Sequence, residues 1–171
     1  MSQKNVILIG MPGSGKSTSG VLLAKSLGLS FVDTDLLLQH QEGSLLQDLI
    51  SQRGFSGFIQ AEEKIISSLD VKKSVISTGG SVIYSSESMS HLRDIGVIVY
   101  LQVSFEEIVN RIQNISTRGI ALKDGQSLKN LYDERLPLYE KYADIIVSGD
   151  GKSIEEFVTE ITKKVKPWIE S

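Results

Sequence analysis

The chain has 171 residues, enough for one domain with a hydrophobic core, and its 40% hydrophobic and 23% charged residues are typical of an ordinary globular protein. A net charge of −3 without any basic stretch argues against a nucleic-acid-binding protein. There is no cysteine, which excludes a disulfide framework, a cysteine zinc site and a thiol nucleophile, and which is typical of a reducing compartment.

The predicted elements begin with a short apolar run over residues 6–9, which Gly10 and Pro12 soon interrupt. This run is too short for a signal peptide or a membrane span, so we expect a cytoplasmic protein that does not bind membranes. Further buried strands are predicted at 31–32, 74–77, 97–101 and 144–147. Helices are predicted over 16–27, after residue 35, from a cap at Ser44 through 50, and over 58–69.

Two further helix starts match the capping-box pattern, in which a serine is followed three residues later by a glutamate. They are Ser104 with Glu107 and Ser153 with Glu156. Strongly apolar strands that alternate with helices predict one α/β domain over residues 1–171, with a parallel sheet covered by helices on both faces.

Residues 10–17 read Gly-Met-Pro-Gly-Ser-Gly-Lys-Ser and match the phosphate-loop pattern G-x-x-x-x-G-K-[ST] in full. Gly13, Ser14 and Gly15 let backbone amides curl around phosphate oxygens. Lys16 can reach the β- and γ-phosphates, and the Ser17 hydroxyl can hold Mg²⁺. A glycine turn with a chance lysine is the alternative. The position between the first strand and the first helix favours ATP and Mg²⁺ binding.

Asp33 and Asp35 follow the second predicted strand, where an extended backbone would point both side chains the same way. The carboxyl edge of a parallel sheet is where ligands of α/β proteins bind. Asp33 could therefore bind magnesium, and Asp35 could orient an acceptor hydroxyl and take its proton. The alternative is that one of them only caps the next helix.

Four segments resemble the shikimate kinase family of P-loop kinases, within the nucleoside-monophosphate-kinase-like group. They are Gly10 to Thr18, Phe31 to Asp35, Ser77 to Gly80, and Glu134 to Tyr139. The last is the most specific, since Glu-Arg-x-Pro-x-Tyr is unusual outside that family. The resemblance covers nearly the whole chain and implies a P-loop α/β/α fold with a five-stranded parallel sheet. It also implies a substrate-binding segment over about residues 33–62 and a lid over about residues 112–126 that closes over ATP.

The resemblance further implies roles for single residues, in binding nucleotide, acceptor and metal and in catalysis. The implied nucleotide-binding residues are Gly13, Ser14, Gly15, Lys16, Ser17, Thr18, the adenine-side Arg111 and the lid residue Arg118. The implied shikimate contacts are Asp35, Gly79, Gly80 and Arg135, and the implied metal residues are Ser17 and Asp33. The implied catalytic residues are Lys16, Asp35 and Arg118.

Arg135 and Tyr139 are four residues apart, so they share one helix face. An arginine fork suits a carboxylate, although a solvated surface arginine is the alternative. Pro137 inside this helical pattern would cost roughly 3 kcal/mol in an ordinary helix interior, so a kink or break is predicted there.

The chain departs from the family pattern Gly-Glu-x-x-Phe-Arg-x-x-Glu at two positions, because Phe55 replaces the glutamate and Ile59 replaces the carboxylate-binding arginine. Ser81 replaces a third glycine, and the lid's usual Arg-Pro-Leu-Leu reads Arg-Gly-Ile-Ala over 118–121. Either another basic residue, Arg53 or Lys64, replaces the lost contact, or the acceptor differs from shikimate.

The leading hypothesis is therefore a monomeric shikimate kinase in which Asp35 aligns the acceptor hydroxyl and Arg118 arrives with the lid. A kinase of the same fold for another small hydroxylated metabolite is the first alternative. A catalytically silent nucleotide-binding module is the second, and the retention of Lys16, Ser17 and Asp33 argues against it.

Overall fold

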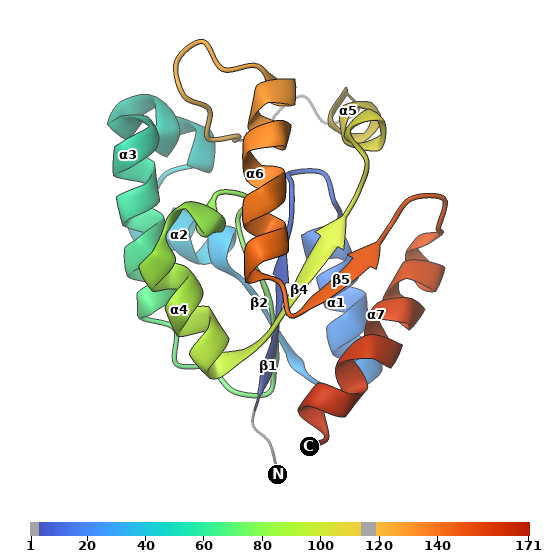
Figure 1. Cartoon of the computed structure of the whole chain (residues 1–171). Helices are drawn as coiled ribbons and strands as arrows, with labels where there is room; N and C mark the ends of the chain where they lie inside the picture. Colours follow the sequence, from blue (N-terminus) through green and yellow to red (C-terminus); the bar gives the residue numbers. More distant parts are fainter. Residues whose placement is uncertain (1–3, 114–118) are drawn as a thin grey trace.

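The computed structural model describes residues 4–113 and 119–171 (Figure 1). Five parallel strands form one sheet in the order β2-β3-β1-β4-β5. They are β1 (Asn5–Ile9), β2 (Ser30–Asp33), β3 (Ser74–Ser77), β4 (Gly96–Gln102) and β5 (Ile145–Ser148). All five predicted strands are confirmed, with ends that differ by at most one residue.

Helices cover both faces of this sheet (Figure 1). They are α1 (Lys16–Leu27), α2 (Thr34–Glu42), α3 (Leu46–Ser67), α4 (Ser86–Ile95), α5 (Phe105–Gln113), α6 (Leu128–Tyr142) and α7 (Ile154–Ile169), with a short 3-10 helix η1 (Val82–Tyr84). None of the helices in the described part of the chain is long and apolar enough to cross a membrane.

The alternation of side chains along β1 explains the two main layers of the core. Val6 and Leu8 pack in a cluster with Leu23 of α1 and Ile161 of α7. Their neighbours Ile7 and Ile9 point to the opposite face, where α4 and α6 supply Met89, Leu92, Leu131 and Tyr139. Every residue of β1 is buried, as expected of a central parallel strand.

The predicted helices are confirmed, but two local predictions, the cap at Ser44 and a break at Pro137, need correction. Ser44 does not cap α3; its N-cap is Leu45, and the side chain of Gln39 accepts the amide of Leu46 instead, at 3.1 Å. The two helices predicted on either side of residue 54 are both present, as the two parts of α3 that meet at a kink at Gly54, whose φ is 68°. No break occurs at Pro137, through which α6 continues, with Arg135 and Tyr139 anchoring its buried face.

The predicted serine caps at the starts of α5 and α7 are confirmed. Ser104 accepts the amide of Glu107 at 3.4 Å, and Ser153 accepts that of Glu156 at 3.1 Å. Helix α1 ends at Gly28 in a left-handed conformation, as the sequence predicts.

Candidate active site

The phosphate loop connects β1 to α1 at the centre of the sheet. Helix α1 begins at Lys16 without a side-chain cap, so the amides of its first turn have no partner within the helix. The Nζ atom of Lys16 donates to the carbonyl oxygens of Gly10 and Met11, at 2.8 and 2.9 Å. The hydroxyl of Ser14 is buried and has no hydrogen-bond partner among the described residues. An uncapped helix start, a lysine and an orphaned hydroxyl fit a polyphosphate.

The two oxygens of Asp33 accept hydrogen bonds from different parts of the chain. Oδ1 accepts the amides of Asp35 and Leu36, at 3.0 and 3.3 Å, and so caps α2. Oδ2 accepts the hydroxyl of Ser17 at 3.0 Å, and Ser77 Oγ lies 3.3 Å from the same hydroxyl. Asp33 therefore caps α2, which the sequence analysis considered as an alternative, and it also accepts a hydrogen bond from Ser17.

The oxygens of Ser17 and Asp33 match what Mg²⁺ needs from a kinase. No group of three or more His, Cys, Asp or Glu side chains able to hold a metal occurs within residues 4–113 and 119–171. Mg²⁺ is usually held by one or two protein oxygens together with substrate phosphates and water. The chain therefore offers a partial ligand set that a nucleotide would complete.

The sequence predicted that Asp35 lies on extended backbone, and this prediction is wrong. Helix α2 starts at Thr34, so Asp35 is its second residue. Its side chain nevertheless faces the site. It lines a cavity of about 440 Å³ together with Pro12, Lys16, Ser17, Thr18, Thr78 and Gly80. A carboxylate and the phosphate loop therefore border the same space, which can hold an acceptor hydroxyl.

Arg135 is a buried residue, not the solvated surface arginine that the sequence left as an alternative, since only 1% of it is exposed. Its Nη2 atom donates to the carbonyl of Ala121 at 3.0 Å. A Cβ atom on Gly80 would lie 2.8 Å from its Nη1 atom, so the guanidinium points at Gly80, which lines the cavity. Tyr139 fixes the same loop, because its hydroxyl donates to the Gly80 carbonyl at 2.6 Å.

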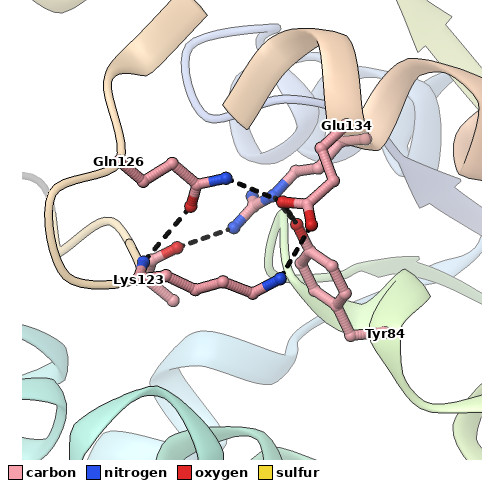
Figure 2. Close-up of polar contacts among 6 residues, drawn as sticks. Tyr84, Lys123, Gln126 and Glu134 are labelled. Carbon is pink, nitrogen blue, oxygen red and sulfur yellow. Dashed lines mark hydrogen bonds and ion pairs between the residues drawn. The ribbon is translucent and has the colours of Figure 1, made fainter. Parts of the chain in front are cut away.

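The carboxylate of Glu134 connects its own helix α6 with η1 and with residues 123–126 (Figure 2). The sequence alone did not connect these three segments. The carboxylate accepts Lys123 Nζ and Gln126 Nε2, each at 2.7 Å, and the Tyr84 hydroxyl at 2.9 Å. The Lys123 hydrogen bond, followed by that of Gln126, lowers the pKa of Glu134 to about 2. Tyr84 also accepts Nε of Arg135 at 3.4 Å. The network thus anchors residues 123–126 beside the buried guanidinium.

Both departures on α3 are accommodated by apolar packing. Phe55 makes an edge-to-face contact with Tyr84, with ring centroids 5.1 Å apart, and Lys123 Nζ lies 5.4 Å from its ring. Ile59 packs against a cluster of Leu38, Leu49, Phe58, Ala61, Ile65 and Ala121. The family's charged positions are therefore occupied here by side chains that hold the chain around Ala121 against α3.

Neither basic residue named as a replacement for the lost arginine lines the cavity. Arg53 forms an ion pair with Glu42, and 42% of its side chain is exposed. Lys64 is exposed. Replacement of the arginine by Arg53 or Lys64 is thus not supported in this arrangement.

Glu62 has acquired a different partner. Its Oε1 accepts the hydroxyl of Ser81 at 2.9 Å, while its Oε2 is buried without a hydrogen-bond partner among the described residues. Burial, and then the negative charge of Asp35, raise the pKa of Glu62 to about 8. Sequence reasoning missed this pair, although the serine in place of a glycine was its signal.

On the other side of the phosphate loop, Arg111 lies where an adenine-side arginine is predicted. Its Nη1 donates to the Gly13 carbonyl at 3.1 Å, and its Nε pairs with Glu107 at 2.9 Å. It lines a cavity of about 390 Å³ shared with Gly15, Thr18, Lys152 and Phe157, of which the sequence did not identify the last two. Arg118 lies outside the described residues, so its role and that of the lid stay predictions.

The fold and this site define a P-loop kinase for a small molecule. The shikimate kinase family model matches residues 12–166. The shikimate kinase of Persephonella marina is 35% identical over 164 residues, which cover 95% of this chain and 99% of that protein. The shikimate kinase structure from Aquifex aeolicus has a TM-score of 0.77 and 32% identity, covering 95% and 96% of the two chains.

A shikimate kinase from Acinetobacter baumannii, solved in complex with shikimate, has a TM-score of 0.85 and 26% identity over 95% of this chain and 92% of that one. The chain belongs to the shikimate kinase family. The resemblance inferred from four short motifs is therefore confirmed over almost its full length.

Proposed function

We propose that this protein transfers the γ-phosphoryl group of ATP to a hydroxyl of shikimate, producing shikimate 3-phosphate and ADP. The observation that carries the proposal is one cavity bordered by Lys16, Ser17 and Asp35, with the buried guanidinium of Arg135 directed at its Gly80 edge. The phosphate loop suits the nucleotide, Asp35 the acceptor hydroxyl, and Arg135 the carboxylate of shikimate.

In the proposed reaction the acceptor oxygen forms a bond to the γ-phosphorus while the bond to the β–γ bridging oxygen breaks and ADP leaves. Asp35 aligns the hydroxyl and takes its proton. Lys16 holds the β- and γ-oxygens, and Arg118 is proposed to neutralise charge on the transferring group. Bound Mg²⁺ supplies positive charge beside those oxygens, and Ser17 and Asp33 are the residues that would hold it, directly or through water.

Ile59 favours a second candidate, a kinase of the same fold for another hydroxylated metabolite. A hydrogen bond to a charged group is worth about 1.5–3 kcal/mol, so the absent arginine would weaken shikimate binding by roughly 10- to 150-fold. The apolar cluster around Ile59 suits an acceptor that is less anionic or more apolar at that end.

A cytoplasmic location, a monomeric state, the boundaries of the substrate segment and the lid stay predictions.

A coupled ADP-release assay tests both candidates. The wild type is assayed with shikimate and with a panel of hydroxy acids, polyols and amino alcohols, and ³¹P NMR identifies the product. We expect a KM for shikimate in the usual range of about 1 μM to 1 mM. A much better acceptor in the panel, or a sharp rise in shikimate turnover in Ile59→Arg, would favour the second candidate. Nucleotide binding without turnover of any acceptor would support a silent module.

A further inference from the structure

Two of the chain's departures from the family pattern meet at Glu62. The arginine position of the family is Ile59, which packs in an apolar cluster, and the third glycine position is Ser81. The Ser81 hydroxyl donates to Glu62 Oε1 at 2.9 Å. Only 4% of Glu62 is exposed. A serine hydroxyl, at a position where the family has glycine, has thus become the hydrogen-bond partner of this buried carboxyl.

The second oxygen of Glu62 lies beside Gly79 and close to Asp35, which lines the cavity of about 440 Å³. A Cβ atom on Gly79 would lie 2.6 Å from Glu62 Oε2 and 2.7 Å from Asp35 Oδ1. The two carboxyl oxygens therefore border the same small space, no further apart than the sum of these distances. Two carboxylates that share a buried site cannot both be ionised at low cost, and desolvation favours the proton on the more buried one.

The charged and titratable groups that face Glu62 come from three helices. Asp35 of α2 acts against ionisation, while Arg135 of α6 and Lys16 of α1 favour it. Tyr139 of α6 lies close enough for Glu62 to influence its titration. Burial is the largest influence and, with Asp35, raises the pKa of Glu62 to about 8 despite the Ser81 hydrogen bond.

We propose that Glu62 carries a proton in the working enzyme, and that this proton compensates for the missing arginine because it removes a negative charge close to Arg135, the residue proposed to bind the acceptor's carboxylate. The inference rests on the proposed function. An ionised glutamate paired with arginine contributes no net charge, and neither does a protonated Glu62 beside Ile59. The pocket keeps its attraction for an anionic acceptor although it has lost a cation.

This arrangement makes acceptor binding sensitive to alkaline pH. When Glu62 loses its proton, it repels both Asp35 and an anionic acceptor. The neutral carboxyl, in contrast, can donate a hydrogen bond from Oε2 into the space over Gly79. Glu62 is thus a positioning and specificity residue, whose protonated form is the competent one.

The test measures kcat and KM for shikimate from about pH 6 to about pH 9.5. With a pKa of about 8, the protonated fraction falls about tenfold between pH 7 and pH 9, so KM is expected to rise by about that factor while kcat changes little. In Glu62→Gln this rise disappears. In Ser81→Ala it moves to higher pH, because the hydroxyl stabilises the ionised form.

Glu63→Gln is the matched control, since Glu63 is the next residue on α3 and is hydrogen-bonded by Ser85. It is expected to keep the wild-type pH profile, and the KM for ATP should not follow the rise in any variant. A rise in KM that persists unchanged in Glu62→Gln, or a loss of the rise in Glu63→Gln, overturns the inference.

A measurement that needs no turnover separates this inference from the proposed function. The ¹³C carboxyl signal of Glu62, assigned by its absence in Glu62→Gln, is titrated in the protein without ligands. A midpoint near 8 supports the proposal, and a midpoint near the ordinary value of 4.5 overturns it. Failure to phosphorylate shikimate would refute the proposed function, and the titration would still decide where the proton resides.

Discussion

Replacing Glu62 by glutamine is expected to stabilise the protein at pH 8 and to have little effect near pH 4.5. In the folded protein, burial and the charge of Asp35 raise the pKa of Glu62 to about 8, whereas the unfolded chain releases this proton near 4.5. Between these values the folded state holds a proton that the unfolded state has released. The free energy of unfolding therefore falls as the pH rises.

The size of the effect follows from the width of this interval. Each pH unit is worth about 1.4 kcal/mol, so the passage from 4.5 to about 8 lowers the free energy of unfolding by on the order of 5 kcal/mol. Glutamine has no proton to lose and keeps a similar shape. At pH 8 the Tm of Glu62→Gln is therefore expected to exceed that of the wild type by roughly 10 to 20 °C.

The assay is urea unfolding of both proteins at several pH values between about 4.5 and 8, followed by circular dichroism. The difference between the two curves removes the contributions of the titrating groups that do not interact with Glu62, because these are the same in both proteins. Parallel curves across the interval would mean that Glu62 is already ionised in the folded state, and the reasoning would be refuted. Glu63→Gln, which leaves Glu62 in place, should keep the fall in the free energy of unfolding that Glu62 causes.

Three other substitutions test the rest of the site. Lys16→Ala should lower kcat/KM by orders of magnitude with unchanged circular dichroism, and normal turnover would contradict the assigned role. Gly79→Ala places a methyl group 2.6 Å from a carboxyl oxygen, so acceptor turnover should fall at least tenfold while ADP affinity, measured by calorimetry, stays within about twofold. Tyr139→Phe removes the 2.6 Å bond to the Gly80 carbonyl and should lower the free energy of unfolding by about 1–3 kcal/mol in urea; a value near zero would mean that the carbonyl finds another partner.

The sequence predicted the sheet, the phosphate loop and the capped helices because each is coded locally. A run of β-branched residues, a glycine-rich loop and a serine before a helix act over a few positions. The error at Asp35 was also local, since α2 starts at Thr34 and not after Asp35 as the extended backbone would require. The Ser44 cap failed because Gln39, from the preceding helix, satisfies the amide of Leu46.

The rest of the site depends on contacts between segments that are far apart in the chain. The Ser81 hydroxyl meets Glu62 across 19 positions, and Tyr84 meets Glu134 across 50. A periodic pattern in the sequence does not predict such pairs. They form only when the loop after β3 packs between α3 and α6. The substitution at Ser81 was noticed as a departure, but its physical meaning needed the carboxyl beside it.

Asp33 accepts hydrogen bonds both from Ser17 and from the first amides of α2. The position of Ser17 and the start of α2 therefore depend on the same side chain. An asparagine at this position has one carbonyl oxygen for the two sets of partners that the carboxylate now divides between Oδ1 and Oδ2. Either the start of the helix or the hydroxyl would lose its acceptor. A substitution at Asp33 would thus alter at the same time the helix that carries Asp35 and the surroundings of Ser17, the residue expected to hold the metal.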